Sequence, residues 1–243
     1  GSDIVMALDQ LVGLPSDDQT VCQATDRTHR WLFRCIAAFD GLGGPQHAGL
    51  FGICQGGIEA DMRRASAEKI AASAVDGCAI GGLSVGEPKP VMAEMLEVVA
   101  PILPANKPRY LMGVGSPEDL WMGVARGIDL FDCVLPTRLA RNGALFTPNG
   151  RINIKQARFA DLHEPIVADC TCATCATFSA SYVRHLFRAK ETLGLRLASI
   201  HNLHFVAREM ETIRFSIEQG SFAAEYSAFL DRYQPTGGRT ATW

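Results

Sequence analysis

Five short apolar runs recur along the first 135 residues of the chain, and each is continuous rather than alternating with polar residues. Continuous apolar runs of this length are typical of strands that are buried on both faces of a parallel sheet. The runs are Ile4–Leu8, Leu50–Cys54, Cys78–Gly81, Tyr110–Val114 and Leu130–Val134. Helical patterns separate several of them, at Ala65–Ala74, at Val91–Val99 and from Ser116 to Arg126. The alternation predicts a parallel α/β fold.

Polar or glycine residues stand at the end of every predicted strand. They are Asp9-Gln10, Gln55-Gly56-Gly57, Gly81-Gly82, Gly113 with Gly115, and Asp132. Functional groups at the carboxyl ends of successive parallel strands are typical of a (β/α)₈ barrel, whose active site is built there. The dinucleotide-binding pattern G-x-G-x-x-G follows none of these runs, which disfavours an open nucleotide-binding sheet. We therefore predict a partial TIM barrel, with about five of its eight strands present.

The start of the chain suggests a missing segment. The sequence opens on Gly1-Ser2 without a methionine, and the first strand pattern begins at once, at Asp3. We therefore expect that an N-terminal part of the barrel precedes this sequence.

The pattern changes after Gly143, which predicts a second region. We expect residues 1–149 to form the barrel portion, residues 150–203 a zinc-binding subdomain, and residues 204–243 helices that pack back on the barrel. Residues 144–169 have little strand character. Helices are predicted at Ser179–Lys190, from about Asn202 to Gln219, and at Phe222–Tyr233, and the tail Pro235–Trp243 is expected to fray.

Three cysteines within six residues carry the strongest chemical signal. Cys170, Cys172 and Cys175 are followed by His201, and a Cys₃His set suits a closed tetrahedral zinc site. Such a site leaves no position for a substrate, so its expected role is structural. His185 and His204 are rival fourth ligands, and a disulfide plus a spare thiol is the alternative interpretation. His201 is preferred because apolar residues surround it in the sequence.

Bulk properties exclude several classes of protein. Nearly half of the 243 residues are hydrophobic, which allows a sizeable core. The sequence shows no signal-peptide pattern and no run of membrane-spanning length, so we predict a cytoplasmic protein whose eight cysteines are reduced. The net charge of −3 argues against a surface covered in basic residues, although a local basic patch stays compatible with it.

Three strand-end side chains could serve one ligand. Asp132 and Asp9 follow different predicted strands, and carboxylates act as nucleophiles at glycosidic carbons. Asp132 is predicted inside an apolar strand end, where a buried carboxylate is expensive unless it is paired or used. The alternative is a structural aspartate that accepts from the next loop's amides. Gln55, followed by two glycines, could read an amide or base edge at close approach.

Taken together, these segments resemble the tRNA-guanine transglycosylase family. The resemblance covers essentially the whole chain and rests on Ser2 to Asp9, Phe51-Gly52-Ile53 with Gln55-Gly56-Gly57, Gly81-Gly82-Leu83 with Val85-Gly86-Glu87, Tyr110 to Gly115, Asp129 to Arg138, Ala140 to Gly143, and the zinc spacing. It implies a transferase that exchanges guanine at the wobble position, 34, of certain tRNAs for a 7-deazaguanine base, preQ1 or queuine, in queuosine biosynthesis. The exchange would run by double displacement through a covalent Asp–tRNA intermediate.

The resemblance also implies a role for each matching residue. Asp132 would be the nucleophile, and Asp9, Gln55 and the Gly82 amide would read the guanine-like edge. Met112 would form a wall of the base pocket, the Leu83 carbonyl would meet the substituent of the incoming base, and Arg138 and Arg141 would contact the anticodon. The family's general acid/base aspartate lies on a segment that would precede this sequence, so we expect an incomplete pocket here. Leu11 resembles the queuine-using branch of the family at its position, whereas Val85 resembles the bacterial branch. The resemblance therefore does not decide between preQ1 and queuine as the incoming base.

The resemblance finally implies assembly into a homodimer. Phe178, Tyr182 and His185 are spaced to share one face of a helix, and equivalent positions line a two-fold interface in the family. Three alternatives compete: a non-catalytic partner subunit of the same family, a zinc-stabilised RNA-binding protein, and another sugar-processing barrel. A non-catalytic partner subunit predicts loss of Asp132, which is present. A zinc-stabilised RNA-binding protein does not need Asp9, Gln55 and Asp132 at strand ends. Another sugar-processing barrel needs neither the anticodon-side arginines nor the zinc spacing.

Overall fold

The computed structural model describes residues 1–235, and these residues form two compact units. The sheet unit, as we name it, comprises Gly1–Val114 and Met122–Asp132, and the cysteine unit comprises Gly115–Trp121 and the described residues from Cys133 onward. The predicted division into three parts at residues 149 and 203 stays a prediction. The predicted fraying of the tail falls, from Thr236 on, outside the described residues. Among residues 1–235, no helix is both long and apolar enough to cross a membrane.

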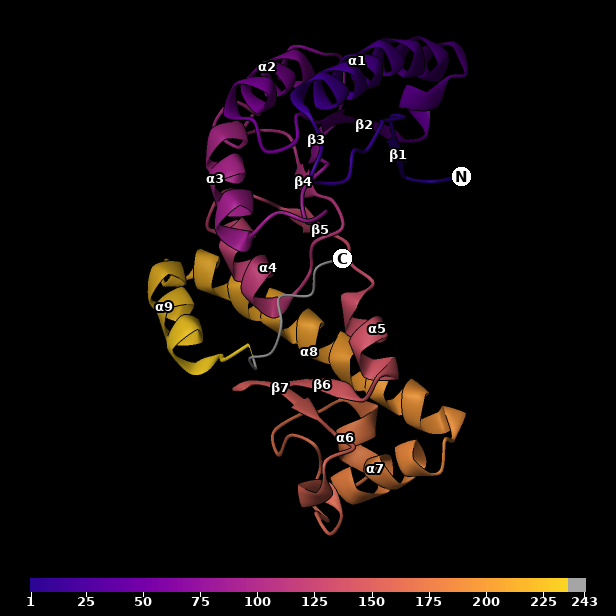
Figure 1. The fold of residues 1–243 in the computed structure, drawn as a ribbon, viewed down its shortest axis with the longest axis vertical. Helices are drawn as coiled ribbons and strands as arrows, with labels where there is room; N and C mark the ends of the chain where they lie inside the picture. Colours follow the sequence, from indigo (N-terminus) through magenta and orange to yellow (C-terminus); the bar gives the residue numbers. More distant parts are fainter. Residues whose placement is uncertain (236–243) are drawn as a thin grey trace. The chain divides into compact units, whose positions relative to one another are not determined.

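A curled parallel sheet of five strands organises the sheet unit (Figure 1). The strands are β1 (Ile4–Met6), β2 (Gly49–Cys54), β3 (Gly77–Ile80), β4 (Arg109–Leu111) and β5 (Leu130–Phe131), and they pair in chain order. All four pairings are parallel, with Ile53 opposite Ala79 and Leu111 opposite Phe131 as examples. The five predicted strands and the partial barrel are therefore confirmed. Each strand ends two or three residues earlier than predicted, except β2 and β3, which keep their length within one residue.

The helices of the sheet unit connect these strands. They are α1 (Asp18–Gly41), the 3₁₀ turn η1 (Gly44–Gln46), α2 (Ala60–Ala71) and α3 (Lys89–Val99), while α4 (Pro117–Val124) begins in the cysteine unit and ends in the sheet unit. The sequence patterns predicted α2, α3 and α4 with shifted ends, but they did not predict α1. This helix starts where the Asp17 carboxylate accepts from the Thr20 amide at 2.8 Å, an N-cap of standard type.

The core of the sheet unit lies between the sheet and its helices. Fully buried members include Leu32 from α1, Ile70 from α2, Ile80 from β3 and Leu96 from α3. Each helix therefore contributes an apolar side chain to the same core, which fixes the strand ends relative to one another.

The cysteine unit consists of helices and one hairpin. Its elements are α5 (Leu135–Arg141), β6 (Ala144–Thr147), β7 (Gly150–Asn153), the 3₁₀ turn η2 (Ala157–Phe159), α6 (Ala173–Thr177), α7 (Ala180–Arg188), α8 (Thr192–Glu218) and α9 (Phe222–Arg232). The antiparallel pair β6–β7 corrects the expectation of few strands after residue 144. Helix α8 begins ten residues before the predicted start at Asn202. Its early turns were missed because Gly194 weakens the helical pattern, and because Leu193, Leu195 and Leu197 alternate with other residues instead of recurring at helical spacing.

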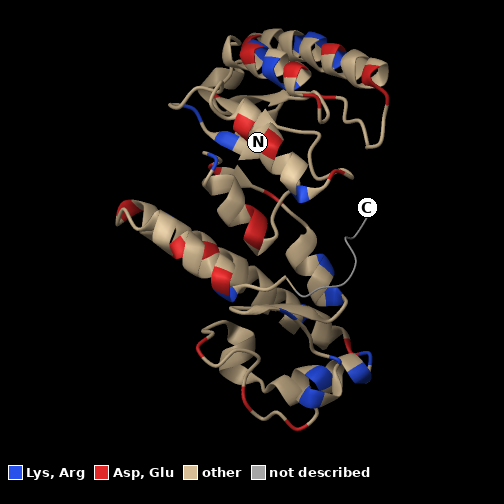
Figure 2. Cartoon of the chain, turned by 60° about the vertical axis from the view of Figure 1, so that its left-hand side comes forward, with Lys and Arg blue, Asp and Glu red and all other residues tan. Residues whose placement is uncertain are grey.

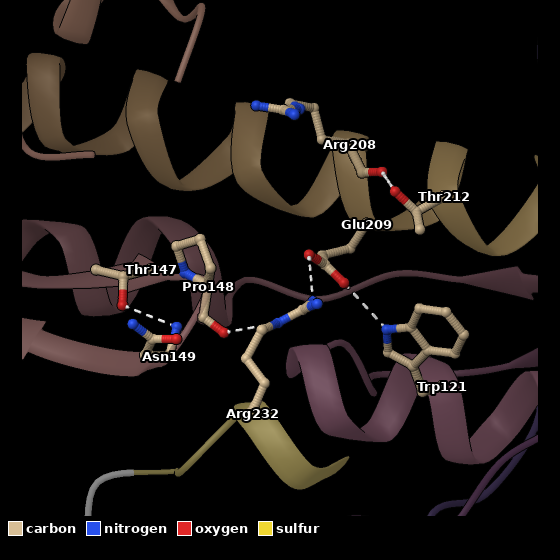
Figure 3. Close-up of polar contacts among 8 residues, drawn as sticks. All are labelled: Trp121, Thr147, Pro148, Asn149, Arg208, Glu209, Thr212 and Arg232. Carbon is tan, nitrogen blue, oxygen red and sulfur yellow. Dashed lines mark hydrogen bonds and ion pairs between the residues drawn. The ribbon is translucent and has the colours of Figure 1, made fainter. Parts of the chain in front are cut away.

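A buried carboxylate joins three elements of the cysteine unit (Figure 3). Glu209 of α8 accepts from the Trp121 indole at 3.0 Å and lies 3.9 Å from the guanidinium of Arg232. Arg232 also donates to the carbonyl of Pro148, in the turn between β6 and β7. The Trp121 ring stacks against Phe229 of α9 with centroids 5.4 Å apart. The polar contacts and the ring contacts together hold α9 against α8 and the hairpin.

Candidate functional site

The first part of the site is a carboxylate–amide pair at the ends of β1 and β2. Gln55 directly follows β2 and is only 3% exposed, and its Nε2 donates to Asp9 Oδ2 at 2.6 Å. The Gln55 main-chain amide donates to Ser66 Oγ of α2 at 3.0 Å, and Ser66 Oγ lies 2.9 Å from His29 Nε2 of α1. Both the side chain and the main chain of Gln55 are therefore held, so its amide faces in one direction.

Two glycines lie directly beside this pair. A Cβ atom on Gly82 would lie 2.3 Å from Gln55 Oε1, and one on Gly81 would lie 2.7 Å from Gln55 Nε2. Gly82 also has a φ of +66°, which favours glycine. The structure therefore places Asp9, Gln55 and Gly82 together, and the glycines permit the close approach.

Asp132 directly follows β5 and forms the second part of the site. Its Oδ1 accepts from the Tyr110 hydroxyl at 2.6 Å and from the Gly113 amide at 2.7 Å. Asp132 is exposed, which corrects the expectation of a carboxylate inside an apolar strand end, because β5 already ends at Phe131. Two donors on one oxygen fix the carboxylate and leave its Oδ2 to face a ligand.

Tyr110 is a site residue whose role the sequence patterns did not indicate. Partial burial, followed by the hydrogen bond to Asp132 and the charge of that carboxylate, raises the pKa of Tyr110. The hydroxyl therefore stays protonated at neutral and mildly alkaline pH and remains a donor to Asp132. A tyrosine at the start of a predicted strand reads as an ordinary core residue, so only the pairing of β4 with β5 reveals this contact.

Two more of the predicted residues lie on the loops after β3 and β4. Leu83 is buried, and Met112 is half-buried with its amide bonded to the carbonyl of Ile80 at 3.1 Å. The Glu87 carboxylate accepts from the amides of Ser84 and Val85, which closes the loop that follows Leu83. Leu83 and Met112 therefore belong to loops that border the carboxyl end of the sheet.

The predicted anticodon contacts lie in the other unit. Arg138 and Arg141 are exposed in the last turn of α5, three residues apart and hence on neighbouring parts of one helix face. Figure 2 shows further Lys and Arg positions (blue) on the short helices of the cysteine unit, where Arg184 and Arg188 belong to α7. The acidic net charge therefore coexists with locally basic helix surfaces.

The four predicted metal ligands are gathered in the cysteine unit. Ligand atoms of Cys170, Cys172, Cys175 and His201 all lie within 4.8 Å of one another. His201 is fully buried, and its Nδ1 lies 3.3 Å from Cys175 Sγ and 3.7 Å from Cys172 Sγ. The other ring nitrogen, Nε2, lies 2.9 Å from the carbonyl of Phe146, which directs Nδ1 toward the thiols. This cluster could hold a metal ion.

The rival ligands and the disulfide are not supported by the geometry. His204 Nε2 lies 3.3 Å from the hydroxyl of Thr171, and His185 is exposed on α7. All three cysteines of the cluster are free thiols. Burial opposes ionisation of the Cys172 thiol, but hydrogen bonds from His201 and from neighbouring groups lower its pKa to about 6. A thiol that ionises this readily is prepared to bind a cation.

Known proteins resemble this chain over nearly its whole length. A family model described as queuine tRNA-ribosyltransferase matches residues 1–235. Proteins named queuine tRNA-ribosyltransferase are 56% identical over 234 residues in Herpetosiphon aurantiacus, 53% identical over 233 residues in Symbiobacterium thermophilum and 50% identical over 233 residues in Lysinibacillus sphaericus. Each comparison covers 96% of this chain, and 59%, 58% and 60% of the respective relative.

The chain thus spans about three fifths of the length of these curated relatives. The identities are high and the family model covers every described residue, so the predicted resemblance is confirmed. The chain belongs to the queuine tRNA-ribosyltransferase family.

Proposed function

We propose that the protein containing this chain is a tRNA-guanine transglycosylase, which replaces guanine at the wobble position of tRNA with a 7-deazaguanine base. The observation that carries this proposal is the Asp132 carboxylate, fixed through one oxygen by Tyr110 and Gly113 at the end of β5. It belongs to the same sheet as the Asp9–Gln55 pair. The carboxyl ends of parallel strands meet at one edge of a barrel, where a nucleophile and base-reading groups could serve one substrate.

In the proposed reaction Asp132 acts as the nucleophile. Its Oδ2 attacks C1′ of the wobble nucleoside, and the bond from C1′ to the base nitrogen breaks as the oxygen–carbon bond forms. The electron pair leaves with guanine, which takes up a proton. The incoming base then loses a proton, attacks C1′ from the opposite face and releases the carboxylate. Two inversions retain the configuration at the sugar, as in two-step glycosidases.

Base recognition is assigned to the groups around Gln55. A flipped base can be read through its hydrogen-bonding edge, and the Gln55 amide, the Asp9 carboxylate and the Gly82 N–H offer donors and acceptors at one place. Met112 and Leu83 would form the apolar border of the pocket. The Leu83 carbonyl would meet the substituent of preQ1 or queuine.

Zinc is the metal proposed for the cysteine cluster, with one ion per chain. Three thiolates and one imidazole are the donor set of closed structural zinc sites, and the bond from His201 to the Phe146 carbonyl is the usual outer support of a histidine ligand. The ion would fasten α6 and α8 to the hairpin.

The proposed tRNA contacts and the proposed dimer both lie on the cysteine unit. Arg138 and Arg141 would contact phosphates or bases beside the wobble nucleotide. Tyr182 is 39% exposed and stacks between Phe178 and His185, with ring centroids at 5.3 and 6.5 Å. Phe178 precedes α7 rather than belonging to it, which corrects the predicted single helix face. An exposed aromatic stack is a suitable centre for a homodimer interface.

Guanine exchange into tRNA tests the proposed function. In the full-length natural protein, labelled guanine should enter tRNAs that carry G34, and Asp132→Asn should abolish this exchange while tRNA binding persists. Asp129→Asn is the matched control, because Asp129 lies before the same strand and accepts from the Arg109 amide at 2.8 Å. Exchange that survives Asp132→Asn, or that Asp129→Asn abolishes equally, would contradict the assignment.

A further inference from the structure

Arg63 is a fully buried arginine behind the proposed base-reading groups. It lies on α2, has no exposed surface, and donates to main-chain carbonyls of the last residue of β2 and of the loops after β2 and β3. Its Nε donates to Gly57 at 2.7 Å, one terminal nitrogen to Gly81 at 2.7 Å and to Cys54 at 3.4 Å, and the other to Gly82 at 2.8 Å. Burial lowers the pKa of Arg63, but a guanidinium starts so high that it keeps its donors at neutral pH.

The hydrogen bonds of Arg63 determine which way two peptide groups face. In a trans peptide the C=O of one residue and the N–H of the next point in opposite directions. The Gly81 carbonyl that Arg63 binds shares its peptide plane with the Gly82 N–H. When this carbonyl points toward α2, the Gly82 N–H points away from α2. The Gly82 carbonyl fixes the Gly82–Leu83 peptide in the same way.

Two consecutive glycines cannot hold this orientation themselves. Gly82 has a φ of +66°, and glycine rotates between such conformations at little cost. A residue with a side chain at position 82 cannot restrict the backbone rotation instead, because a Cβ on Gly82 would lie 2.3 Å from Gln55 Oε1. The restraint must come from outside the loop, and the planar fork of an arginine can hold two carbonyls at once.

We propose that Arg63 is a positioning residue that aims the Gly82 N–H at the acceptor on the six-membered ring of the bound base, an inference that rests on the proposed function. An N–H donor reads an acceptor, and the acceptor that distinguishes guanine from 2-aminopurine is its 6-oxygen. Arg63 touches neither the base nor the reacting atoms. It acts through the main chain of Gly81 and Gly82.

Arg109 provides a control that separates positioning from stability. It also donates to main-chain carbonyls, of Leu103 at 2.6 Å and of Gly127 at 3.4 Å. However, Arg109 is the first residue of β4, at the opposite end of the strand from Gly113 and the proposed site. Arg109→Lys should therefore lower stability without affecting base recognition.

The test compares Arg63→Lys, Arg63→Gln and Arg109→Lys in the full-length natural protein. Lysine and glutamine can each donate to only some of the carbonyls that Arg63 binds, so the Gly81–Gly82 peptide group can rotate. In both Arg63 variants the KM for guanine should rise about tenfold, the effect of one lost hydrogen bond. The inhibition constant of 2-aminopurine, which lacks the 6-oxygen, and the KM for tRNA should change less than about threefold. Arg109→Lys should leave all three constants unchanged at a comparable loss of melting temperature.

Three results would overturn the inference. They are an equal weakening of guanine and 2-aminopurine, guanine recognition unchanged in folded Arg63 variants, and loss of folding in both Arg63 variants while Arg109→Lys folds. If the unmodified protein exchanges no guanine, the proposed function fails by itself. The crystal structure of Arg63→Lys then tests the inference. It should show the Gly81 carbonyl in more than one orientation, and a carbonyl that still points only toward α2 would contradict the inference.

Discussion

The sheet unit and the cysteine unit assemble their functional groups in different ways. In the sheet unit, Asp9, Gln55 and Asp132 are far apart in the sequence, and only the order of parallel strands brings them to one edge. In the cysteine unit, three ligands lie within Cys170–Cys175, and one turn of α8 supplies the fourth. A site whose residues are brought together by strand order shows in a sequence only as polar residues at separate strand ends. A site whose ligands lie close together in the sequence can be recognised from their spacing alone.

The two units also differ in how they treat their reactive groups. Asp132 is exposed and fixed through one oxygen, so its other oxygen can reach a substrate. His201 is fully buried, and both of its ring nitrogens have neighbours within 3.3 Å. An accessible group suits chemistry and an enclosed group suits structure. We therefore expect changes in the sheet unit to act on turnover and changes in the cysteine unit to act on stability or assembly.

The largest effect is expected from removing a metal ligand. Cys172→Ser should abolish binding of the proposed zinc ion and unfold much of the cysteine unit, because binding of a structural zinc ion contributes on the order of 10 kcal/mol to folding. Metal analysis and amide hydrogen exchange would measure this, with protection lost in α6 and α7 but kept in β2 and β3. Cys22→Ser, at an exposed free cysteine of α1, is the control. Metal content and protection equal to those of the unmodified protein would show that the cluster is not a metal site.

The next effect concerns assembly. Tyr182→Ala should shift the full-length protein from dimer to monomer at micromolar concentration, because loss of a central aromatic anchor typically costs about 2 kcal/mol or more. Light scattering measures the shift. Tyr226→Phe, which keeps a ring stacked on Trp121, should leave the mass unchanged. A protein that is monomeric before substitution, or a dimer indifferent to Tyr182→Ala, contradicts the proposed interface.

A smaller effect is expected at Tyr110. Tyr110→Phe removes one donor from Asp132 Oδ1 and leaves the Gly113 amide in place. The guanine exchange rate should fall about tenfold, because one hydrogen bond to a charged group is worth roughly 1.5 kcal/mol. The melting temperature should stay nearly constant, since the hydroxyl lies at the accessible edge of the sheet. A large loss of stability without loss of rate would place Tyr110 among the structural residues.

The smallest effect is expected at the anticodon side. Arg141→Ala should weaken tRNA binding by a few fold and reduce the dependence of the logarithm of affinity on salt by about one unit, as for one lost phosphate contact. Binding titrations at several salt concentrations measure both quantities. Arg214→Ala, on the exposed side of α8, is the control. Equal salt slopes for the Arg141→Ala variant and the unmodified protein would remove Arg141 from the tRNA interface.

Much of this architecture could be predicted from the sequence, for physical reasons. Buried parallel strands such as Leu50–Cys54 are continuous apolar runs, and metal ligands keep short spacings. Helix α1 was missed because its buried face includes Thr25, Thr28 and His29, which hide the apolar periodicity. His29 faces Ser66, which accepts from the Gln55 amide, so His29 belongs to the support of Gln55 rather than to a simple core.

The contacts that support the site could not be predicted in the same way. Tyr110 meets Asp132 only because β4 pairs with β5, and Arg63 meets Gly81 and Gly82 only because α2 packs behind the ends of β2 and β3. Neither relation has a sequence spacing of its own. Arg63 lies before the predicted helix Ala65–Ala74, where an arginine reads as a solvated side chain, although it is completely buried. Supporting residues of this kind become visible only when the strands and helices are placed in space.

The central claim is that Asp132 of the sheet unit forms the covalent bond to tRNA. The full-length natural protein should be mixed with a G34-containing tRNA, quenched in denaturant and digested, and the peptide that keeps the nucleotide should be identified by mass spectrometry. The proposed mechanism predicts an adduct on the peptide containing Asp132 and no adduct in Asp132→Asn. An adduct that persists in Asp132→Asn, or that maps to another residue, would contradict it.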